Sequence, residues 1–251
     1  MLKQTLRRIV RKTGFDIVRY ERTVHPLARR LHLLSTHAID LVFDIGANSG
    51  QYARQLRTAG FKGRIISFEP QVAAYKRLVK HAQYDPLWEV VNIALGDTDC
   101  EVKIHIAGNS LSSSLLEMLP SHIRSDPKSA YIGDERVTLR KLDSILDTYY
   151  RRGNKLYVKI DTQGFEKRVI AGAQTSLDKI VGIQVEMSLV PLYCGETLFT
   201  EMVRFLEHEG FTLMSVEPDF SDPTTGQLLQ LDGVFFRASE SLYYRSSAEC
   251  P

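Results

Sequence analysis

Residues 41–52 read LVFDIGANSGQY, an apolar run that ends in an acid and then breaks into glycines and an asparagine. An apolar strand that stops at a glycine-rich bend and restarts as a helix is how open α/β sheets build a nucleotide crevice. Residues 46–50 form G-x-x-x-G, and Asn48 stands where a dinucleotide-binding turn has its second glycine. That glycine lets a pyrophosphate approach the backbone, so its absence disfavours a dinucleotide.

Acids at the ends of predicted strands indicate which ligand the crevice takes. Asp44 directly precedes the turn, where it would repel phosphates but suit a ligand with an ammonium and a sulfonium centre, such as S-adenosylmethionine. Glu69 ends the second strand, about 20 residues downstream, where a carboxylate accepts hydrogen bonds from both ribose hydroxyls. After the third strand, we expect Ala94 and Leu95 to lie on the adenine and Asp97 to accept from its amino group. Taken singly, each motif also fits another nucleotide site or a plain tight turn.

Strands and helices alternate along the whole chain. The predicted strands of the main sheet are 41–45, 64–68, 89–93, 156–161 and 181–187. The predicted helices between and after them are 50–59, 71–82, 142–150, 165–177 and 197–209. EVKIHIA (101–107) alternates with period two and predicts a local hairpin, and residues 108–134 form a long polar segment typical of a functional lid. FTLMSVE (211–217) and DGVFFRA (232–238) predict an antiparallel hairpin at one edge of a mostly parallel, doubly wound sheet.

The basic character of the chain belongs to its N-terminus. Residues 1–40 contain nine Lys or Arg against three acids, although the net charge of the whole chain is only +2. Leu2, Leu6, Ile9 and Val10 recur at helical spacing, which predicts a short basic amphipathic helix. It would either dock on an anionic membrane or cover an end of the sheet, and we favour the second. We expect a basic helical extension (1–38), one catalytic domain (39–239) and a tail (240–251).

Several functional classes are disfavoured by composition. The three cysteines are far apart and lack CxxC spacing, which argues against disulfides or a zinc site, and no other metal-ligand set stands out. No apolar stretch approaches the roughly 20 residues of a membrane-spanning helix, so we expect a cytoplasmic protein, with peripheral contact at the inner face of the membrane left open. The segment after the fourth strand lacks a base-flipping motif and the pI is near 8.4, so no nucleic-acid partner is expected.

The motifs together resemble a known family. VFDIGANSGQYARQL, ISFEP, NIALGD, the SLSSSLL loop, VTLRKLDSIL and YVKIDTQGFEKRVIAGA are similar to successive motifs of the FkbM-type methyltransferases. The resemblance implies a class I methyltransferase (Rossmann-like) fold, S-adenosyl-L-methionine as cofactor, and O-methylation of a small-molecule or glycan acceptor: a sugar, a precursor of polysaccharide biosynthesis or a secondary metabolite. The implied cofactor-binding residues are Asp44, Gly46, Ala47, Asn48, Gly50, Gln51, Tyr52, Glu69, Pro70, Ala94, Leu95, Asp97 and Ser112. The chain departs from the family at Gln163, where many members have Glu.

Methyl transfer to a hydroxyl needs an aligned acceptor and a group that takes its proton. A carboxylate at the carboxyl end of the fourth or fifth strand suits this role, which makes Asp161 and Glu186 the catalytic candidates, with Asp161 nearer the transferred methyl. Glu166 fits a first-turn helix charge equally well, and His105 or His122 in the polar segment are alternative bases. Two other functions compete: a nicotinamide-dependent oxidoreductase, disfavoured by the turn, and a non-catalytic membrane-surface protein.

Overall fold

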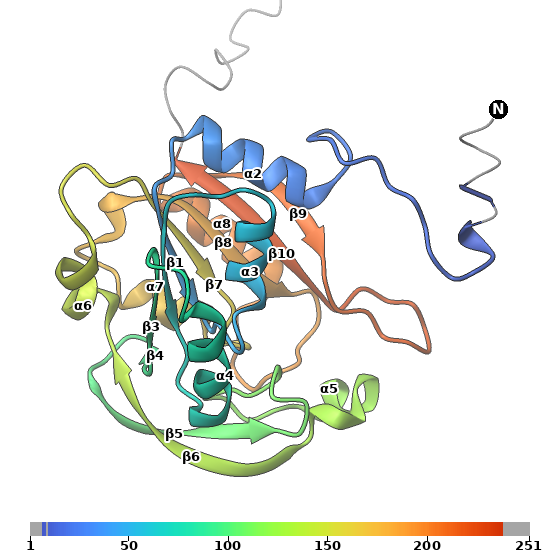
Figure 1. The fold of residues 1–251 in the computed structure, drawn as a ribbon. Helices are drawn as coiled ribbons and strands as arrows, with labels where there is room; N and C mark the ends of the chain where they lie inside the picture. The colour runs from blue at the N-terminus through green and yellow to red at the C-terminus, as the bar shows by residue number, and fades with distance from the viewer. Residues whose placement is uncertain (1–6, 9, 238–251) are drawn as a thin grey trace, which may run out of the picture.

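The computed structural model describes residues 7, 8 and 10–237 (Figure 1). Short apolar strands form the main sheet, which carries the cavity described below. Seven strands pair in the order β3-β2-β1-β7-β8-β10-β9. Their bounds are β1 (Leu41–Ile45), β2 (Arg64–Phe68), β3 (Trp88–Val91), β7 (Leu156–Ile160), β8 (Ile180–Ser188), β9 (Phe211–Pro218) and β10 (Gln230–Arg237). The pairs from β3 through β8 are parallel, and β10 is antiparallel to both β8 and β9. The prediction of a doubly wound, mostly parallel sheet with an antiparallel hairpin is confirmed.

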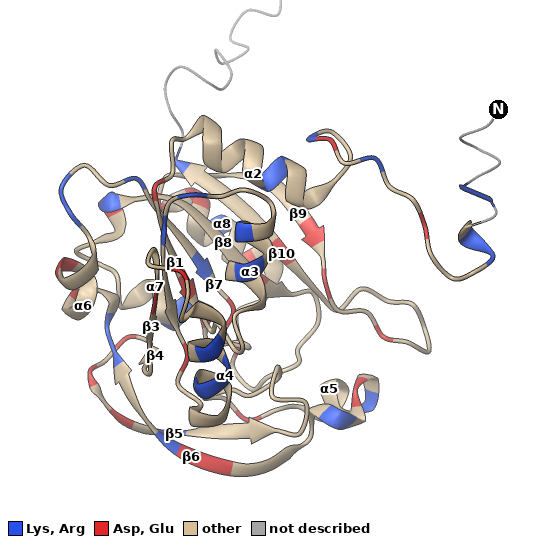
Figure 2. Ribbon diagram, in the orientation of Figure 1, with Lys and Arg blue, Asp and Glu red and all other residues tan. Residues whose placement is uncertain are grey.

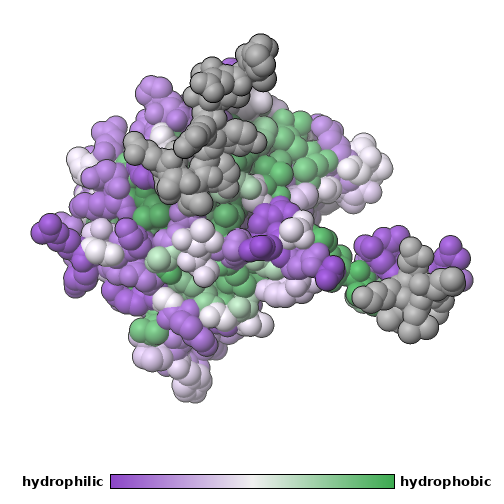
Figure 3. Space-filling view, turned by 90° about the horizontal axis from the view of Figure 1, so that it is seen from above, coloured by the Kyte–Doolittle hydropathy of each residue, from purple (hydrophilic) through white to green (hydrophobic). Residues whose placement is uncertain are grey.

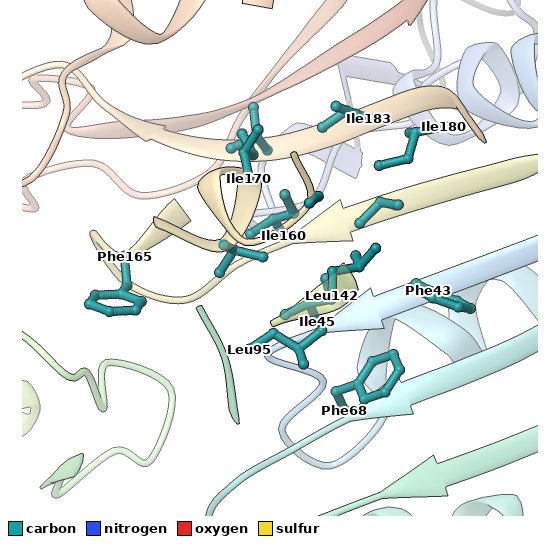
Figure 4. Packing of buried hydrophobic residues seen from close by; sticks show 14 of the residues in the cluster. Phe43, Ile45, Phe68, Leu95, Leu142, Ile160, Phe165, Ile170, Ile180 and Ile183 are labelled. Atoms are coloured by element: carbon teal, nitrogen blue, oxygen red, sulfur yellow. The ribbon is translucent and has the colours of Figure 1, made fainter. Parts of the chain in front are cut away.

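Helices cover both faces of this sheet, which is why its central strands are apolar on both sides. One face packs on α2 (Pro26–Thr36), α3 (Gln51–Thr58) and α4 (Val72–Ala82), and the other on α6 (Leu142–Tyr149), α7 (Glu166–Ala171) and α8 (Phe199–His208). Strand alternation sorts the side chains: Phe43 and Ile45 of β1 face the second group, whereas Val42 faces the first. In Figure 4, side chains of β1, β2 and β7 form one layer, and the rings of Phe43 and Phe68 meet edge to face at 5.4 Å.

A second, three-stranded sheet lies against the first, in the order β4-β6-β5. Its strands are β4 (Ala94–Leu95), β5 (Cys100–Ala107) and β6 (Tyr131–Arg140), and β5 pairs antiparallel with β6. Residues 108–130 separate the two strands, so this pairing is not the local hairpin that the sequence predicted. The polar segment between them holds α5 (Pro120–Ser125) and the short 3₁₀ helix η1 (Pro127–Ser129). It ends earlier than predicted, because Tyr131, Gly133 and Asp134 already pair with β5.

One predicted helix is much shorter than its sequence pattern suggested. The pattern predicted 165–177, but α7 ends at Ala171 and a 3₁₀ helix, η2 (Leu177–Lys179), follows separately. A Cβ atom at Gly172 would lie 1.9 Å from the carbonyl oxygen of Gly96. The chain uses the missing side chain to bring two backbones together, and this contact replaces the continuation of the helix.

The N-terminal prediction holds only in part. Residues 1–6 and 9 of the predicted helix, and the predicted tail 240–251, lie outside the described residues; residues 7, 8, 10 and 11 are helical. This short helix stands away from the sheet and covers no end of it (Figure 1). The expected boundary at residue 38 falls after α2, whose Leu33 and Leu34 belong to the core. Within the described ranges, no helix combines the length and apolar character needed to cross a membrane.

Candidate functional site

A cavity of about 550 Å³ opens at the carboxyl ends of β1, β2, β7 and β8. This is the edge at which open α/β sheets bind ligands, and the volume lies in the usual range for small-molecule sites. Its walls come from the turn after β1, the end of β2, the residues after β3, the polar segment after β5, and the acidic ends of β7 to β10. One half of the cavity follows the glycine turn, and the other is rich in carboxyl groups.

The turn after β1 is shaped by backbone that only certain residues tolerate. Gly46 has φ +76°, and a Cβ there would lie 1.8 Å from the carbonyl oxygen of Asp161. Asn48 also has a left-handed φ, +46°, which asparagine tolerates better than most residues. Its backbone N–H donates to Glu69 Oε2 at 2.7 Å, and its side-chain amide donates to the carbonyl of Ser110 at 3.0 Å. Asn48 therefore joins the turn both to the end of β2 and to the polar segment after β5.

Glu69 lies in the wall of the cavity and is almost fully buried. Its two oxygens accept from the backbone N–H groups of Asn48 and Gln71, at 2.7 and 2.9 Å. Burial outweighs these two bonds and raises the pKa of Glu69 to about 7. Each carboxylate oxygen can accept more than one hydrogen bond, so Glu69 in its ionised form keeps accepting capacity for a ligand.

The structure brings most of the predicted residues to this one cavity. Those that line it are Gly46, Ala47, Asn48, Gln51, Tyr52, Glu69, Pro70, Ala94, Leu95, Asp161 and Glu186. Four predicted cofactor-binding residues are not in the lining: Asp44, Gly50, Asp97 and Ser112.

Asp44 lies beneath the turn rather than at the cavity wall. Its backbone pairs with Ser67 on one side and Lys159 on the other, and it has no exposed surface. Oδ2 accepts from Ser67 Oγ at 3.0 Å, whereas Oδ1 has no hydrogen-bond partner among the described residues. Burial raises the pKa of Asp44, although the charge of Lys159 opposes this. The expected direct contact between Asp44 and a ligand is thus replaced by contacts inside the sheet.

The other three have different structural roles. Gly50, at φ +85°, precedes α3, and a Cβ there would lie 2.8 Å from the Trp88 ring. Asp97 lies at the surface, where its Oδ2 is 3.4 Å from Nη1 of Arg168. Ser112 is buried within the polar segment. Its hydroxyl accepts a hydrogen bond from Asn109, and its carbonyl oxygen accepts one from the hydroxyl of Tyr193. In that segment, Ser110, Leu111 and Ser113 line the cavity instead.

The carboxyl-rich half is organised around Asp161, directly after β7. Lys159 Nζ donates to Asp161 Oδ2 at 2.8 Å, and Gln163 Nε2 donates to Asp161 Oδ1 at 3.0 Å. Burial disfavours the ammonium of Lys159, but Asp161 and Asp44 outweigh it and raise the pKa of Lys159. Lys159 and Gln163 thus each donate to a different oxygen of Asp161 and hold its side chain in place.

Glu186, on β8, has a contrasting environment. Its Oε2 accepts from Gln163 Nε2 at 2.5 Å and from Gln230 Nε2 at 3.0 Å. Burial, then the nearby charges of Asp161 and Glu166, raises the pKa of Glu186 well above its ordinary value. The donors to Glu186 are neutral amides, whereas Asp161 also accepts from the ammonium of Lys159.

Gln163 joins these two carboxyl groups. In the sequence, this position stood out only as a departure from the family. Its amide nitrogen has two hydrogens, which suits one bond to each carboxyl, and the hydroxyl of Tyr193 donates to its Oε1 at 2.6 Å. Gln163 has φ +56°, so the turn aims the side chain between β7 and β8. A glutamate here would place a third carboxyl group within the same contacts.

The alternative bases lie elsewhere. Glu166 is buried, and its Oε1 accepts from the backbone N–H of Thr162 at 2.8 Å and of Gly164 at 3.1 Å, so it stabilises the turn before α7. His105 pairs with Asp134 at 2.6 Å, outside the cavity lining. His122 packs edge-on against Tyr193, and burial lowers its pKa to about 4.

Four further charged residues line the cavity and were not predicted as site residues: Arg30, Glu217, Asp219 and Asp232. Arg30 comes from α2 and forms an ion pair with Glu217 of β9 in which both side chains are 7% exposed. Asp232 lies near the start of β10, and burial raises its pKa to about 6. The sequence contained a signal for Asp232. An acid near the start of an antiparallel strand lies at the carboxyl edge of the parallel strands, which is where the cavity opens. Among the described residues, no group of three or more His, Cys, Asp or Glu could hold a metal ion.

This strand order, with a glycine turn after β1, an acid ending β2 and a cavity at the carboxyl edge, defines a class I, Rossmann-like methyltransferase fold. Residues 44–213 match the family model of the methyltransferase FkbM domain, and the chain belongs to that family. The prediction of the family is thereby confirmed.

Comparisons with other proteins add similarities of fold. The methyltransferase FkbM from Methylobacillus flagellatus KT is 13% identical with a TM-score of 0.45; the match covers 78% of this chain and 43% of that one, so the chain spans less than half the length of that relative. The magnesium protoporphyrin IX methyltransferase of Synechocystis PCC 6803, solved with bound SAM, is 11% identical over 84% of this chain and 78% of that one, with a TM-score of 0.45. A putative RNA methyltransferase from Pyrococcus horikoshii is 12% identical over 85% and 83%, with a TM-score of 0.43. No curated protein matches the chain.

Proposed function

We propose that this methyltransferase uses S-adenosyl-L-methionine to methylate a hydroxyl of a sugar, a glycan precursor or a secondary metabolite. The observation that carries the proposal is the arrangement of three carboxyl groups in one cavity. Glu69 faces the half beside the glycine turn, whereas Asp161 and Glu186, joined by Gln163, face the other half. The first suits a nucleoside and the second suits an acceptor hydroxyl.

The glycine-turn half fits the adenosine part of S-adenosylmethionine. Glu69 can accept hydrogen bonds from two adjacent ribose hydroxyls, since both of its oxygens retain accepting capacity. Phe68, Ile93 and Leu95 supply an apolar wall for a flat ring. The cofactor, when bound, supplies an electrophilic methyl group on a sulfonium centre.

The carboxyl-rich half suits an acceptor hydroxyl. Asp161 would accept the hydroxyl proton as the new carbon–oxygen bond forms, while Lys159 and Gln163 hold its two oxygens in place. Burial and the neighbouring acids favour the neutral form of Glu186, and that form could donate a hydrogen bond to a second oxygen of the acceptor.

The charge of this half favours a neutral acceptor with several hydroxyls. Besides Asp161 and Glu186, it includes Asp219 and Asp232, while Lys159 and Arg30 are the basic side chains of the lining. Lys159 bonds to Asp161 and Arg30 pairs with Glu217, so neither cation is left to neutralise an anionic acceptor. Carboxyl groups accept hydrogen bonds from sugar hydroxyls and repel phosphates and carboxylates.

The direct test is the identity of the bound small molecule. Mass spectrometry of ligand released from purified protein should find S-adenosylmethionine or its demethylated product, and a panel of neutral sugars should include one that gains a methyl group on oxygen. NAD in place of S-adenosylmethionine, or methyl transfer confined to nitrogen or carbon acceptors, would contradict the proposal.

Glu69 gives a pH-dependent prediction. Its pKa in the folded protein is about 7, above its ordinary value, and only its ionised form can accept from both hydroxyls. We expect the affinity for S-adenosylmethionine to fall as the pH drops below 7, by up to about tenfold per pH unit while one proton is taken up. Calorimetry between pH 5 and pH 8 measures this.

Glu69→Gln is the matched control, because it keeps the shape and cannot titrate. It should bind about 1–3 kcal/mol more weakly than the wild type at pH 8 and lose this pH dependence, since one charge-assisted acceptor is lost. Asp232, with a pKa of about 6, titrates in both proteins, so its contribution to the pH dependence of the affinity cancels when the two are compared. An identical pH slope in the two proteins would remove Glu69 from the cofactor site.

A further inference from the structure

The segment that precedes α2 projects from the fold. The described residues 7, 8 and 10–24, here called the N-terminal arm, run from the short helix to the start of α2 and stand clear of both sheets (Figure 1). Figure 3 shows the arm projecting from the rest of the molecule. Within the described residues, every hydrogen bond of residues 7–20 is made inside the arm. The described contacts that hold the arm lie near its end. Arg29 of α2 donates to the carbonyls of Arg22 and Thr23 at 3.1 and 3.2 Å, Arg22 lies 3.2 Å from His32, and the ring centre of Tyr20 lies 4.9 Å from that of His25.

The arm exposes large apolar side chains. Of the thirteen such side chains exposed in the described part of the chain, five belong to this short segment: Phe15 (72%), Ile17 (47%), Val18 (46%), Tyr20 (58%) and Val24 (49%). A segment that only connects or solvates is instead poor in aromatic and β-branched residues. A concentration of exposed apolar surface marks a contact with another phase or molecule.

The same segment is strongly basic. Its basic residues are Arg7, Arg8, Arg11, Lys12, Arg19 and Arg22, against the two acids Asp16 and Glu21. Asp16 pairs with Arg7 and Arg11 at 2.8 and 2.9 Å, which draws the helix back toward the apolar residues that follow it. Figure 2 shows this blue cluster at the far end of the arm. Apolar and cationic side chains are thereby presented by one short, projecting segment.

We propose that the N-terminal arm docks the protein on an anionic lipid bilayer. Phe15, Tyr20 and their aliphatic neighbours enter the headgroup region, and the arginines and Lys12 contact lipid phosphates. A nucleic acid would satisfy the positive charge but gives no partner to Ile17, Val18 and Val24. A second copy of the arm would bring like charges together, so charge complementarity selects the anionic membrane.

Sedimentation of the full-length protein with vesicles tests this docking. Vesicles of equal parts phosphatidylcholine and phosphatidylglycerol should bind at least about tenfold more protein than phosphatidylcholine alone, and added salt should weaken the binding. Phe15→Ser/Tyr20→Ser and, separately, Arg8→Gln/Lys12→Gln should each lower the affinity by about tenfold. Tyr84→Ser/Ile132→Ser is the matched control, because these side chains are 88% and 74% exposed elsewhere on the fold; it should bind as the wild type does.

Three results would overturn the proposal. The first is equal binding to neutral and anionic vesicles, and the second is wild-type binding by both arm variants. The third is a wild-type protein that binds no vesicles but forms a dimer in ultracentrifugation, which Phe15→Ser/Tyr20→Ser converts to a monomer. The last would assign the arm to a second copy of the chain. Unchanged melting temperature and S-adenosylmethionine affinity in the variants show that the fold is intact, and the docking result stands whether or not the proposed acceptor is correct.

Discussion

Asp161→Asn should lower turnover by roughly 10²- to 10⁴-fold while leaving most of the affinity for S-adenosylmethionine. The amide keeps the size of the side chain but cannot take the acceptor proton. Lys159 and Gln163 fix the two oxygens of Asp161, so a wild-type side chain has little freedom to move away from the acceptor. Single-turnover rates and calorimetry on the same preparation separate the chemical step from cofactor binding.

Glu186→Gln is the paired control. Burial raises the pKa of Glu186, which favours its neutral form, and glutamine has the shape of that neutral form. Turnover in Glu186→Gln should therefore fall by less than about tenfold. Near-normal turnover in Asp161→Asn, with a large loss in Glu186→Gln, would move the base to β8.

A purely structural role of Asp161 also has to be tested. A carboxylate before a glycine bend often caps the turn, but here the backbone N–H of Gly164 donates to Glu166 rather than to Asp161. Asp161→Asn removes one charged partner of buried Lys159, so we expect the melting temperature to fall by a few degrees. Activity should therefore be assayed well below the melting temperature of the variant. Loss of activity that only tracks unfolding would show that the residue is structural.

Arg30→Met should destabilise the protein by about 3–5 kcal/mol in urea denaturation, because it leaves the carboxylate of Glu217 buried without its counter-ion. The side chain of Arg30 donates to other elements: twice to Glu217 on β9 and once to Gln55 on α3, the latter at 3.1 Å. Its guanidinium also lies 5.1 Å from the centre of the Tyr52 ring. The pair therefore attaches α2, and with it the N-terminal arm, to the edge of the sheet.

Two variants check the cause of this loss. Arg30→Met/Glu217→Gln should recover much of the stability, since no unpaired charge remains buried. Lys167→Met breaks the surface pair with Glu201, whose side chains are 40% and 62% exposed, and should cost less than about 1 kcal/mol. A loss below about 1 kcal/mol in Arg30→Met would mean that water reaches the pair and that α2 is held by its apolar contacts alone.

Local patterns in the sequence were enough to predict the parallel half of the fold. The strands 41–45 and 64–68 were predicted at their observed bounds, because each is a short apolar run ended by an acid and a turn. The same logic placed Glu69, Asp161 and Glu186 at the carboxyl edge, where the structure gathers them in one cavity. It failed at α7, because the helical pattern carries no sign that the backbone at Gly172 lies against Gly96.

Local sequence patterns predict the order of strands and helices, the glycine turn and the acids at strand ends, since these depend on neighbours within a few residues. Contacts between distant segments place Arg30 against Glu217, 187 positions away, and Gln163 between Asp161 and Glu186. Packing of distant segments also buries Asp44 in the sheet, leaves Asp97 at the surface and raises the pKa of Glu186. The physical reason is that burial and charge at a side chain come from every element packed around it, and a linear pattern reports only the element on which the side chain lies.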